Sequence, residues 1–534
     1  MKKIVTILLA TCMIAGTLAG CSGNAAPAVP GSAGQAGTDA AVPAGEILTA
    51  TYAYMADPLY NLDPAQTVSN GVHVMNNIYE TLLSYDLTTN TFTNVLAEDY
   101  EVSEDGLSWI FRLRQGVKFH SGGELTAADV KFSVDRIMEL AQGDAYIWAN
   151  VAQVKVLGPY EVEFVLSAPC ALDAVVSCSK GAFIFSKDAF EADNAFFENG
   201  GDCGTGPYTV ESITWGTEVV LSRFDEYWGG WKDGQFDYVI TTFVGETSNR
   251  RLMMEAGGAD ITNSLTQEDI KALAENSNVD LQVEISLKTQ YINLNVNSDK
   301  LSDVRVRQAL AYAMPYQGVI DTAIGTGRGT QAYCAVPPGM LGHSETIPQY
   351  TYDLEKARAL LQEAGHGDGL DMLITFNTGD EVLRLTAELY QAELAKIGVN
   401  LEIRAMSWSE QVALATSENP NDRQDMFMSY TFPALVDAYA ALKYFQTGQG
   451  SNYSGYSNSE FDAKLMEAYS MAGVDKEKAT QMYIELQQTL VSDCPAIWVA
   501  NINDVWVTNS SFQGFKTNGA YTYVCKFYET CRAQ

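Results

Sequence analysis

The chain has 534 residues, 47% of them apolar, which is enough for a large core and more than one lobe. Its 33 Lys and Arg residues stand against 66 Asp and Glu residues, so the net charge at pH 7 is −33. A body this acidic repels phosphate backbones and anionic lipids. We therefore expect no nucleic-acid partner.

The first 20 residues have the ordered features of a secretory signal peptide. Lys2 and Lys3 form a positive start, and the mostly apolar run over 4–15 is too short to span a membrane permanently. The sequence LAGC at 18–21 then resembles the lipobox of bacterial lipoproteins, which implies that Cys21 is lipidated and becomes the mature N-terminus. The alternative is an ordinary secretory peptide with an incidental cysteine. We expect an extracytoplasmic protein that a lipid on Cys21 anchors to the cell membrane.

Residues 21–45 read as a disordered tether. They are mainly Ala, Gly, Pro and Ser with almost no charge, so they cannot bury enough apolar surface to offset the entropy of ordering. A flexible chain of this length spans roughly 25–30 Å on average. After the tether no apolar run reaches about 18 residues, so we expect no membrane-spanning helix in the body.

From residue 46 onward, hydrophobic periodicity predicts a mixture of strands and helices. We expect strands over 47–54, 108–113, 161–166 and 399–404, a strand pair over 208–222, helices over 72–83, 126–140, 304–314, 354–364, 383–397, 461–472 and 476–492, and an extended aromatic segment over 505–527. Thr126 is placed to cap its helix, Gly365 and Gly398 to end theirs, and Gly216 to join the strand pair.

Three stretches, 246–260, 304–320 and 383–404, share a pattern of helix, glycine and strand. This alternation predicts α/β lobes. The strand-rich stretch near 87–203 interrupts the alternation, and we expect it to form a separate subdomain.

No motif in the sequence indicates catalysis. HExxH, GxSxG and CxxC are all absent, and SxxK at Ser177–Lys180 lacks its partner motifs. Among four histidines, His120 is expected to make a structural hydrogen bond, and His366 lies in a solvated turn. We predict that the protein is not an enzyme and holds no metal and no cofactor.

Cysteine usage leaves the redox state open. Seven of the nine cysteines follow the tether, and this odd number leaves at least one unpaired if disulfides form. By sequence distance, Cys170 could pair with Cys178, and Cys525 with Cys531.

Several motifs together resemble the family 5 extracellular solute-binding proteins, the oligopeptide, dipeptide and nickel type of ABC importers. The stretch SEDGLSWIFRLRQGVKFHSGGELTAADVKFSVDRI covers 103–137, GTGPY covers 204–208 and DVRVRQAL covers 303–310. YDLEKARALLQEAG at 352–365 and YSNSEFDAKLMEA at 456–468 follow in the family's order. On their own chemistry most of these motifs concern the fold; Arg305 and Arg307, for example, are expected to fix packing rather than contact solute.

The resemblance implies an α/β fold of the periplasmic-binding-protein-like type II (cluster C), with two lobes, a hinge and an extra inserted domain. By analogy, domain I covers 46–86, 204–287 and 503–534, domain II is the insertion at 87–203, and domain III covers 288–502. The implied function is capture of a small solute in an interlobe cleft and its delivery, intact, to ABC permease subunits, by a protein expected to be a monomer.

The resemblance also places the solute-binding residues, and the polar strand face YINLNVN supports the second group among them. They are expected to be Thr67, Val68 and Ser69; Tyr291, Asn293 and Asn295; Trp408; and Tyr430, Thr431, Phe432 and Asp437. For Trp408 a place in the core is nearly as compatible with the sequence.

The solute is a peptide by family default, but one position argues otherwise. Peptide binders of the family carry an Asp that pairs with the peptide amine, and the register places Ala434 there, although Asp437 could substitute. A buried ammonium without an acid partner is costly. Modified peptides, opine-like compounds, oligosaccharides and metal chelates stay open, as do two other roles: a membrane-tethered extracellular hydrolase on the same fold, and a solute sensor for a receptor.

Overall fold

The computed structural model describes residues 47–533 except for 56–60, 67–70, 194–195, 198 and 522. All the elements below belong to one compact unit, Ala44–Gln534. Within the described ranges, no helix is long and apolar enough to cross a membrane. The predicted signal peptide, the tether and Cys21 lie outside these ranges and stay predictions.

A mixed sheet of eleven strands runs through the described part of the chain, in the order β15-β14-β16-β12-β17-β11-β1-β10-β9-β8, with β13 paired to β17. Its strands are β1 (Thr49–Tyr54), β8 (Tyr208–Thr214), β9 (Glu218–Arg223), β10 (Tyr238–Phe243), β11 (Ile261–Asn263), β12 (Val279–Leu294), β13 (Gly329–Gln331), β14 (Leu370–Asn377), β15 (Val399–Met406), β16 (Met426–Thr431) and β17 (Ala496–Asn509).

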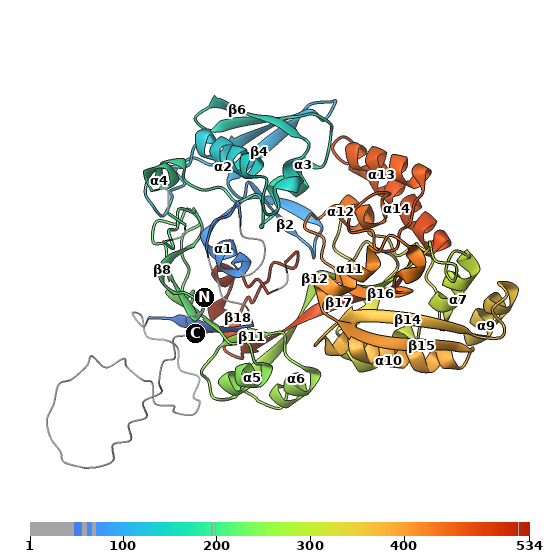
Figure 1. The fold of residues 1–534 in the computed structure, drawn as a ribbon. Helices are drawn as coiled ribbons and strands as arrows, with labels where there is room; N and C mark the ends of the chain where they lie inside the picture. The colour runs from blue at the N-terminus through green and yellow to red at the C-terminus, as the bar shows by residue number, and fades with distance from the viewer. Residues whose placement is uncertain are drawn as a thin grey trace, which may run out of the picture. The chain divides into compact units, whose positions relative to one another are not determined.

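Two long antiparallel strands, β12 and β17, divide this sheet into halves (Figure 1). Their register shifts between Glu284 and Lys288, where three residues of β12 bulge. On one side of the shift, β12 and β17 continue into β11, β1, β10, β9 and β8, and we call this part of the sheet the first half. On the other side they continue into β16, β14, β15 and β13, and we call this part the second half. β12 and β17 therefore connect the two lobes.

Each half contains a parallel core of three strands. In the first half β1 pairs in parallel with β10 and β11, and in the second β14 pairs in parallel with β15 and β16. Parallel strands end at a common edge, and in open α/β sheets ligands bind beyond the carboxyl ends of the strands.

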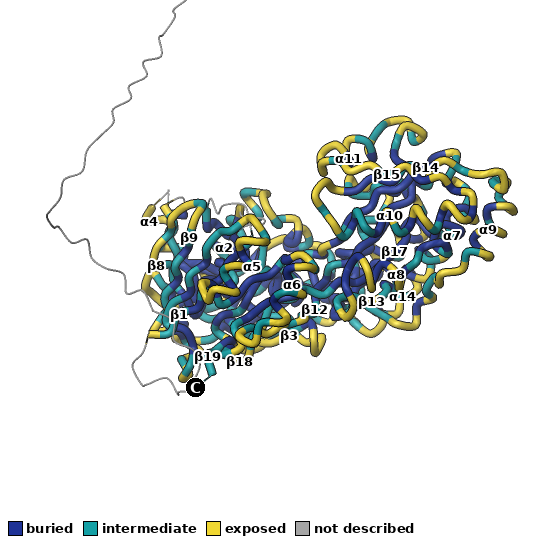
Figure 2. Tube along the Cα trace, turned by 90° about the horizontal axis from the view of Figure 1, so that it is seen from below, coloured by how far each residue is buried: buried dark blue, intermediate teal, exposed yellow. Residues whose placement is uncertain are grey.

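Helices cover both faces of the second half, and the interior strands are buried (Figure 2). The helices of the chain are α1 (Val72–Ile78), α2 (Ala127–Leu140), α3 (Leu172–Val176), α4 (Lys187–Ala192), α5 (Thr247–Glu255), α6 (Gln267–Leu273), α7 (Val304–Ala313), α8 (Tyr316–Val319), α9 (Leu354–Glu363), α10 (Glu381–Ala395), α11 (Trp408–Ala415), α12 (Ala438–Leu442), α13 (Ser459–Met471) and α14 (Lys476–Asp493). One apolar cluster joins α7, α9 and α10 to the sheet, and another joins α12, α13 and α14 to its opposite face.

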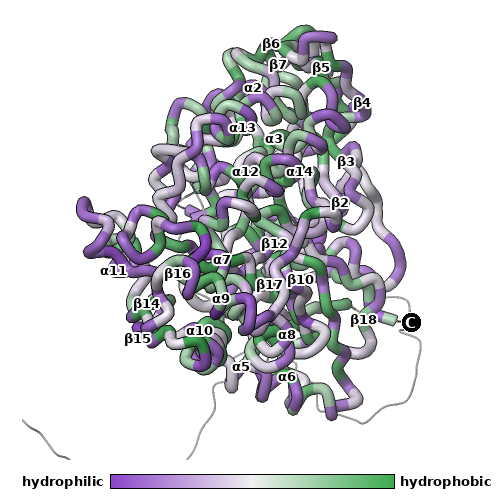
Figure 3. The backbone as a smooth tube through the Cα atoms, turned by 90° about the vertical axis from the view of Figure 1, so that its right-hand side faces the viewer, coloured by the Kyte–Doolittle hydropathy of each residue, from purple (hydrophilic) through white to green (hydrophobic). Residues whose placement is uncertain are grey.

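A separate four-stranded antiparallel sheet, β4-β5-β7-β6, lies within the range predicted as domain II. Its strands are β4 (Ala97–Val102), β5 (Ser108–Leu113), β6 (Val151–Gly158) and β7 (Glu161–Leu166). Figure 3 shows hydrophobic segments, in green, among β5, β6 and β7. The small pairs β2 (Leu83–Asp86) with β3 (Thr91–Asn94) and β18 (Phe512–Gln513) with β19 (Cys531–Arg532) complete the strands of the described residues. The boundaries between the predicted domains stay a prediction.

Most elements agree with the periodicity, and three do not. The aromatic segment expected to be extended over 505–527 is a strand only in the end of β17 and in β18, and its other described residues form no regular strand. The helix expected over 72–83 ends at Ile78, because Tyr79 is extended and Glu80 forms a β-bridge with Ile184. The strand expected near the end of 304–320 is also wrong. Helix α7 ends at its C-cap Met314, directly before Pro315, and α8 and a π-helix (Ile320–Gly325) follow where the strand was expected.

The motifs that carry the family resemblance make structural contacts. Arg305 pairs with Asp303 at 2.6 Å, and Arg307 donates to backbone carbonyls, including that of Asp493 at 2.6 Å. His120 lies 2.8 Å from the Asp202 carboxylate, as its structural role requires. All seven cysteines of the body are free thiols, six of them buried, so neither of the pairings compatible with the sequence is formed.

Candidate functional site

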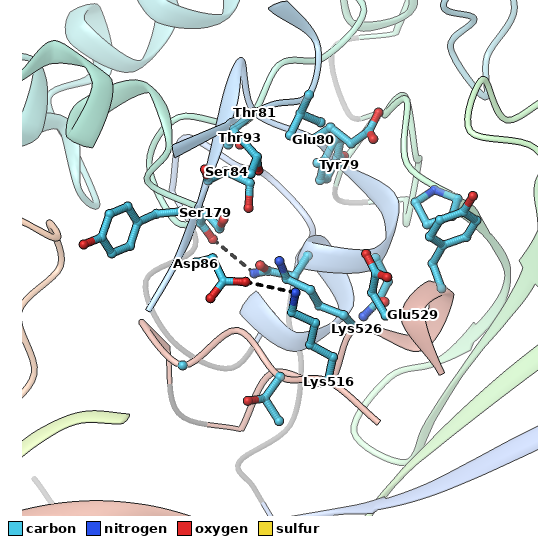
Figure 4. Close-up of a pocket in the computed structure, with 18 of the residues that line it drawn as sticks. Tyr79, Glu80, Thr81, Ser84, Asp86, Thr93, Ser179, Lys516, Lys526 and Glu529 are labelled. Atoms are coloured by element: carbon cyan, nitrogen blue, oxygen red, sulfur yellow. Dashed lines mark hydrogen bonds and ion pairs between the residues drawn. The ribbon is translucent and has the colours of Figure 1, made fainter. Parts of the chain in front are cut away.

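A cavity of about 540 Å³ lies beside the bulge of β12 (Figure 4). Its walls come from α1, from β2 and β3, from residues 227–229, from Glu284 and Ile285 of β12, and from the segment 516–529 near the C-terminus. The volume falls within the roughly 300–1,000 Å³ of small-molecule sites. Residues distant in sequence thus enclose a space large enough for a small solute.

Glu80 stands at one wall of this cavity, buried and fully hydrogen-bonded. Its carboxylate accepts hydrogen bonds from Tyr227 Oη at 2.9 Å, from Trp228 Nε1 at 2.9 Å and from Thr205 Oγ1 at 2.8 Å. Burial raises the pKa of Glu80 to about 7, and these three hydrogen bonds lower it only in part. Because Thr205 belongs to the GTGPY motif, that motif supports this wall.

Two lysines occupy another part of the cavity. Lys516 Nζ lies 3.2 Å from Asp86 Oδ2, and the backbone N–H of Lys526 donates to the carbonyl of Lys516 at 2.9 Å. Burial and the charge of Lys516 lower the pKa of Lys526, against the raising effect of Glu529 and Asp86. Burial raises the pKa of Glu284, although its interactions with Thr517 and with the neighbouring Lys516 both lower it. The cavity therefore carries charged groups of both signs.

A second, much smaller pocket of about 10 Å³ shares Ser84, Tyr85 and Ser179 with this cavity and is lined in the second half by Ala434 and Val436. Tyr521 Oη donates to the Ala434 carbonyl at 3.0 Å and lies 2.9 Å from Cys178 Sγ. Cys178 Sγ is 3.4 Å from the same carbonyl. The position expected to supply an acid for a peptide amine thus presents a methyl group and a carbonyl that already has two donors.

The predicted strand face of β12 is buried rather than open. Tyr291 and Asn293 lie on the face that packs against α12 to α14, and burial raises the pKa of Tyr291, which an interaction with the Asn293 side chain lowers in part. Asn295 donates through Nδ2 to the carbonyl of Pro420 at 2.7 Å. One polar atom on each asparagine, Asn293 Nδ2 and Asn295 Oδ1, is buried without a protein partner.

Tyr430 and Phe432 lie on the opposite face of the second half, around Lys288. The Lys288 ammonium is 4.0 Å from the centre of the Tyr430 ring and 5.7 Å from that of Phe432, which is 47% exposed. Tyr430 Oη donates to Asp380 Oδ1 at 3.0 Å. Burial, the Asp380 carboxylate and Tyr523 of the C-terminal segment all raise the pKa of Tyr430. This group faces the C-terminal segment at the carboxyl edge of β16.

A charged group lies where the two halves meet. Burial lowers the pKa of Lys288 and raises that of Asp504 on β17 to about 6, although Lys288 and Arg328 both act to lower it. Arg328 belongs to the GTGRG stretch at 325–329, which leads into β13, and it supplies a second cation near Asp504.

Trp408 belongs neither to the core nor to the cavity wall. It is 49% exposed at the first turn of α11, and its ring meets Phe427 edge-on at 5.5 Å and Tyr453 at 6.1 Å. Exposed aromatic surface of this kind can stack against a solute.

Asp437 serves the fold. It is buried as the N-cap of α12, where its carboxylate accepts from the Tyr439 N–H at 2.8 Å and from Tyr483 Oη at 2.7 Å. Burial raises its pKa to about 6. Thr431 is also buried, and its hydroxyl has no protein partner.

The predicted residues therefore do not form one surface. Tyr291 and Asn293 are on one face of the second half, Tyr430 and Phe432 are on the other, and Thr67, Val68 and Ser69 lie outside the described residues. No group of metal-binding side chains occurs in the described ranges.

The sequence prediction missed the cavity residues. Glu80 gave a signal, because a single acid inside the apolar run 78–83 must find buried donors. Lys516 and Lys526 gave only a weak one, as two lysines close together in a very acidic chain. Nothing local connects them to Asp86, some 430 residues away.

This fold, two lobes joined by crossing strands with a cavity beside the crossing, defines a binding protein of the periplasmic type. The model of the bacterial extracellular solute-binding proteins, family 5, matches residues 91–453. The chain belongs to this family.

Individual relatives and a solved structure agree with this assignment. The chain is 29% identical over 462 residues to the dipeptide-binding protein of Escherichia coli, covering 79% of this chain and 83% of the relative. It is 29% identical over 421 residues to the glutathione-binding protein GsiB of Salmonella typhimurium, covering 76% and 79%. The structure of HbpA2 from Haemophilus parasuis superimposes with a TM-score of 0.78 at 26% identity, over 91% of this chain and all of that one.

Proposed function

We propose that this protein captures a short peptide or a peptide-like solute between its two halves and delivers it intact to the permease of an ABC importer. The observation that carries the proposal is the cavity of about 540 Å³ beside the bulge of β12, with both acids and lysines in its walls. The small pocket next to it includes Ala434 and Val436 of the second half. A short peptide is a zwitterion, so groups of both signs suit its two ends. The names of the dipeptide-binding and glutathione-binding relatives support the same class.

Closure of the halves is the proposed mechanism of capture. The bulge of β12 between Glu284 and Lys288 is the natural place for bending, with Ser286 Oγ donating to the Ile502 carbonyl at 2.8 Å. Contacts such as Tyr521 with Ala434 connect the C-terminal segment to the second half. A solute drives closure only through its greater affinity for the closed state. No bond in the solute needs to break, so the protein acts as a carrier and not as an enzyme.

The anchor completes the proposal. A lipid on Cys21 holds a monomeric body outside the cytoplasmic membrane, and the segment 21–45 lets it reach the permease. Expression of the chain with Cys21→Ser should release the body into the soluble extracytoplasmic fraction. A body that stays with the membrane after this change would contradict the anchor.

The experiment for the solute uses protein purified from its host and native mass spectrometry of any retained compound, followed by calorimetric titration with peptides of two to five residues. We expect binding of at least one peptide, a rise in melting temperature and recovery of the peptide unchanged. Hydrolysis products would favour the tethered hydrolase. Binding only to non-peptide compounds would refute the proposed solute class, and a genomic neighbourhood with a receptor but no permease would favour the sensor.

A further inference from the structure

The Lys526 ammonium lies in the cavity without an acid partner. Lys526 is half-buried, and among the described residues its Nζ takes part in no hydrogen bond and in no ion pair within 4.0 Å. The adjacent Lys516 differs, because its ammonium is 3.2 Å from Asp86. An unpaired cation removed from water is unfavourable unless something else compensates it.

Acids also line the cavity around the two lysines, namely Asp86, Glu284 and Glu529, but among the described residues none of them lies within 4.0 Å of the Lys526 ammonium. Lys516 and Lys526 are neighbours on two segments joined by a β-bridge between Thr517 and Cys525 and by the Lys526 N–H bond to the Lys516 carbonyl at 2.9 Å. Asp86, the acid within 4.0 Å of the pair, is already engaged with Lys516. Glu529 is exposed to solvent, and its effect on Lys526 is smaller than that of burial and of Lys516.

The backbone around Lys526 is held in place. Cys525 and Phe527 on either side are buried in the core of the first half, and the Phe527 N–H donates to Asn77 Oδ1 at 3.1 Å. The carbonyl of Cys525 accepts from Asn77 Nδ2 at 3.0 Å. The position from which the ammonium extends is therefore fixed before any ligand arrives, which lowers the entropy lost on binding.

Hydroxyl side chains also line this cavity and suit a small hydrogen-bonding ligand. Ser84, Thr93 and Ser179 line the cavity together with Lys516 and Lys526 (Figure 4). Hydroxyl groups can accept or donate, so they can satisfy the polar atoms next to a charged end.

We propose that Lys526 binds a carboxylate of the solute, with Lys516 adding attraction from its place beside Asp86. This inference rests on the proposed function and names one residue of its site. It assigns the solute class as carboxylate-bearing, which a peptide with a free C-terminus satisfies and a C-terminal amide does not. A charge-assisted hydrogen bond from ammonium to carboxylate is the interaction gained.

The test compares each peptide that binds with its C-terminal amide, by calorimetric titration of the full body. Three variants accompany the wild type. Lys526→Gln removes the charge, Lys526→Arg keeps it, and Lys271→Gln makes the same change on the exposed face of α6 as a matched control. We expect the wild type, Lys526→Arg and the control to prefer the free acid by at least tenfold. Lys526→Gln should reduce that preference to less than threefold.

Other outcomes refute either the role of Lys526 or the proposed peptide solute. Equal affinity of the wild type for acid and amide, or an unchanged preference in Lys526→Gln, would refute the role of Lys526 and leave the proposed function standing. If no peptide binds the wild type, the peptide proposal fails, and acetate at constant ionic strength decides the inference. A higher melting temperature in acetate than in chloride for the wild type but not for Lys526→Gln supports a carboxylate site, and identical behaviour refutes it.

Discussion

Breaking the ion pair between Asp63 and Arg136 by removing one partner is expected to cost the folded protein several kcal/mol. The two side chains meet in a two-pronged geometry, with Arg136 Nη1 at 2.7 Å from Asp63 Oδ1 and Nη2 at 2.6 Å from Oδ2. Only 13% of the Arg136 side chain and 6% of the Asp63 side chain are exposed, and the guanidinium also lies 4.4 Å from the centre of the Phe190 ring. Removing one partner of a buried pair leaves an uncompensated charge and costs about 3–5 kcal/mol.

The perturbation is Asp63→Asn, which keeps the shape and removes the charge. With an unfolding entropy of about 2.1 cal/mol/K per residue, a body of about 490 residues has an entropy near 1 kcal/mol/K. A loss of about 3–5 kcal/mol therefore lowers the melting temperature by about 3–5 °C if the body unfolds as one unit. Differential scanning calorimetry at pH 7 measures this shift.

A double-mutant cycle isolates the pair from its surroundings. Arg136→Met alone leaves the Asp63 carboxylate, among the described residues, with one backbone donor, the N–H of Ala65 at 2.9 Å, so we expect a similar loss. The combined variant buries neither charge and should cost at least about 1.5 kcal/mol less than the sum of the single changes. A loss below about 1 kcal/mol in Asp63→Asn, or simple additivity in the cycle, would refute the reasoning.

Three further predictions address the cleft and its supports. Tyr521→Phe removes the hydroxyl that joins the C-terminal segment to the second half. Losing a hydrogen bond of about 0.5–1.5 kcal/mol should weaken solute binding about two- to twelvefold, as measured by titration calorimetry. Unchanged affinity would argue against closure through this contact. Trp408→Ala should weaken solute binding with little change in melting temperature, because Trp408 is half exposed. Tyr291→Ala should lower the free energy of unfolding by roughly 3–5 kcal/mol, because the Tyr291 side chain is buried. The opposite pattern would contradict the exposed position of Trp408 and the buried position of Tyr291. Burial lowers the pKa of His120, but Asp202, the Gly206 carbonyl and Glu80 together raise it above its ordinary value. The stability that His120 contributes relative to His120→Asn is therefore fully present below its unfolded pKa of about 6.5 and is lost as the pH rises through the raised folded value. Urea unfolding from pH 5 to 9 should show this loss, and a constant difference would contradict it.

Local chemistry was enough to predict the elements whose ends depend on neighbouring residues. The carboxylate of Asp129 accepts a hydrogen bond from the Thr126 N–H at 3.0 Å, as the sequence of α2 indicates. Gly365 and Gly398 adopt φ values of +88° and +85° just after α9 and α10. Gly216, at φ +78°, joins β8 to β9.

The errors have tertiary causes. Residues 79–83 have helical spacing, but Glu80 finds its donors on Thr205, Tyr227 and Trp228, and these contacts hold the chain extended. The spacing after Pro315 suits a strand, yet that stretch packs as helix against the core of the second half. Hydrophobic periodicity indicates which face of a segment is buried, but not which elements of the fold that face packs against.

The candidate site was predictable only in part, because its walls are assembled from remote segments. The family resemblance led to the half-buried Tyr430 and the exposed Phe432, whose rings flank Lys288. The resemblance could not indicate Lys526, since its ammonium lacks an acid partner only because Asp86 pairs with Lys516 instead. Such a relation between three charges has no pattern along the chain.

The sharing of β12 and β17 has a consequence for dissecting the gene. Residues 279–284 and 504–509 belong to one lobe, and 288–294 and 496–502 to the other. No uninterrupted stretch of codons therefore encodes either lobe by itself, and any truncation that keeps one lobe exposes unpaired strand edges from the other. Grafting a recognition surface from a paralogue should succeed by exchanging loops on a retained pair of strands, not by swapping fragments end to end.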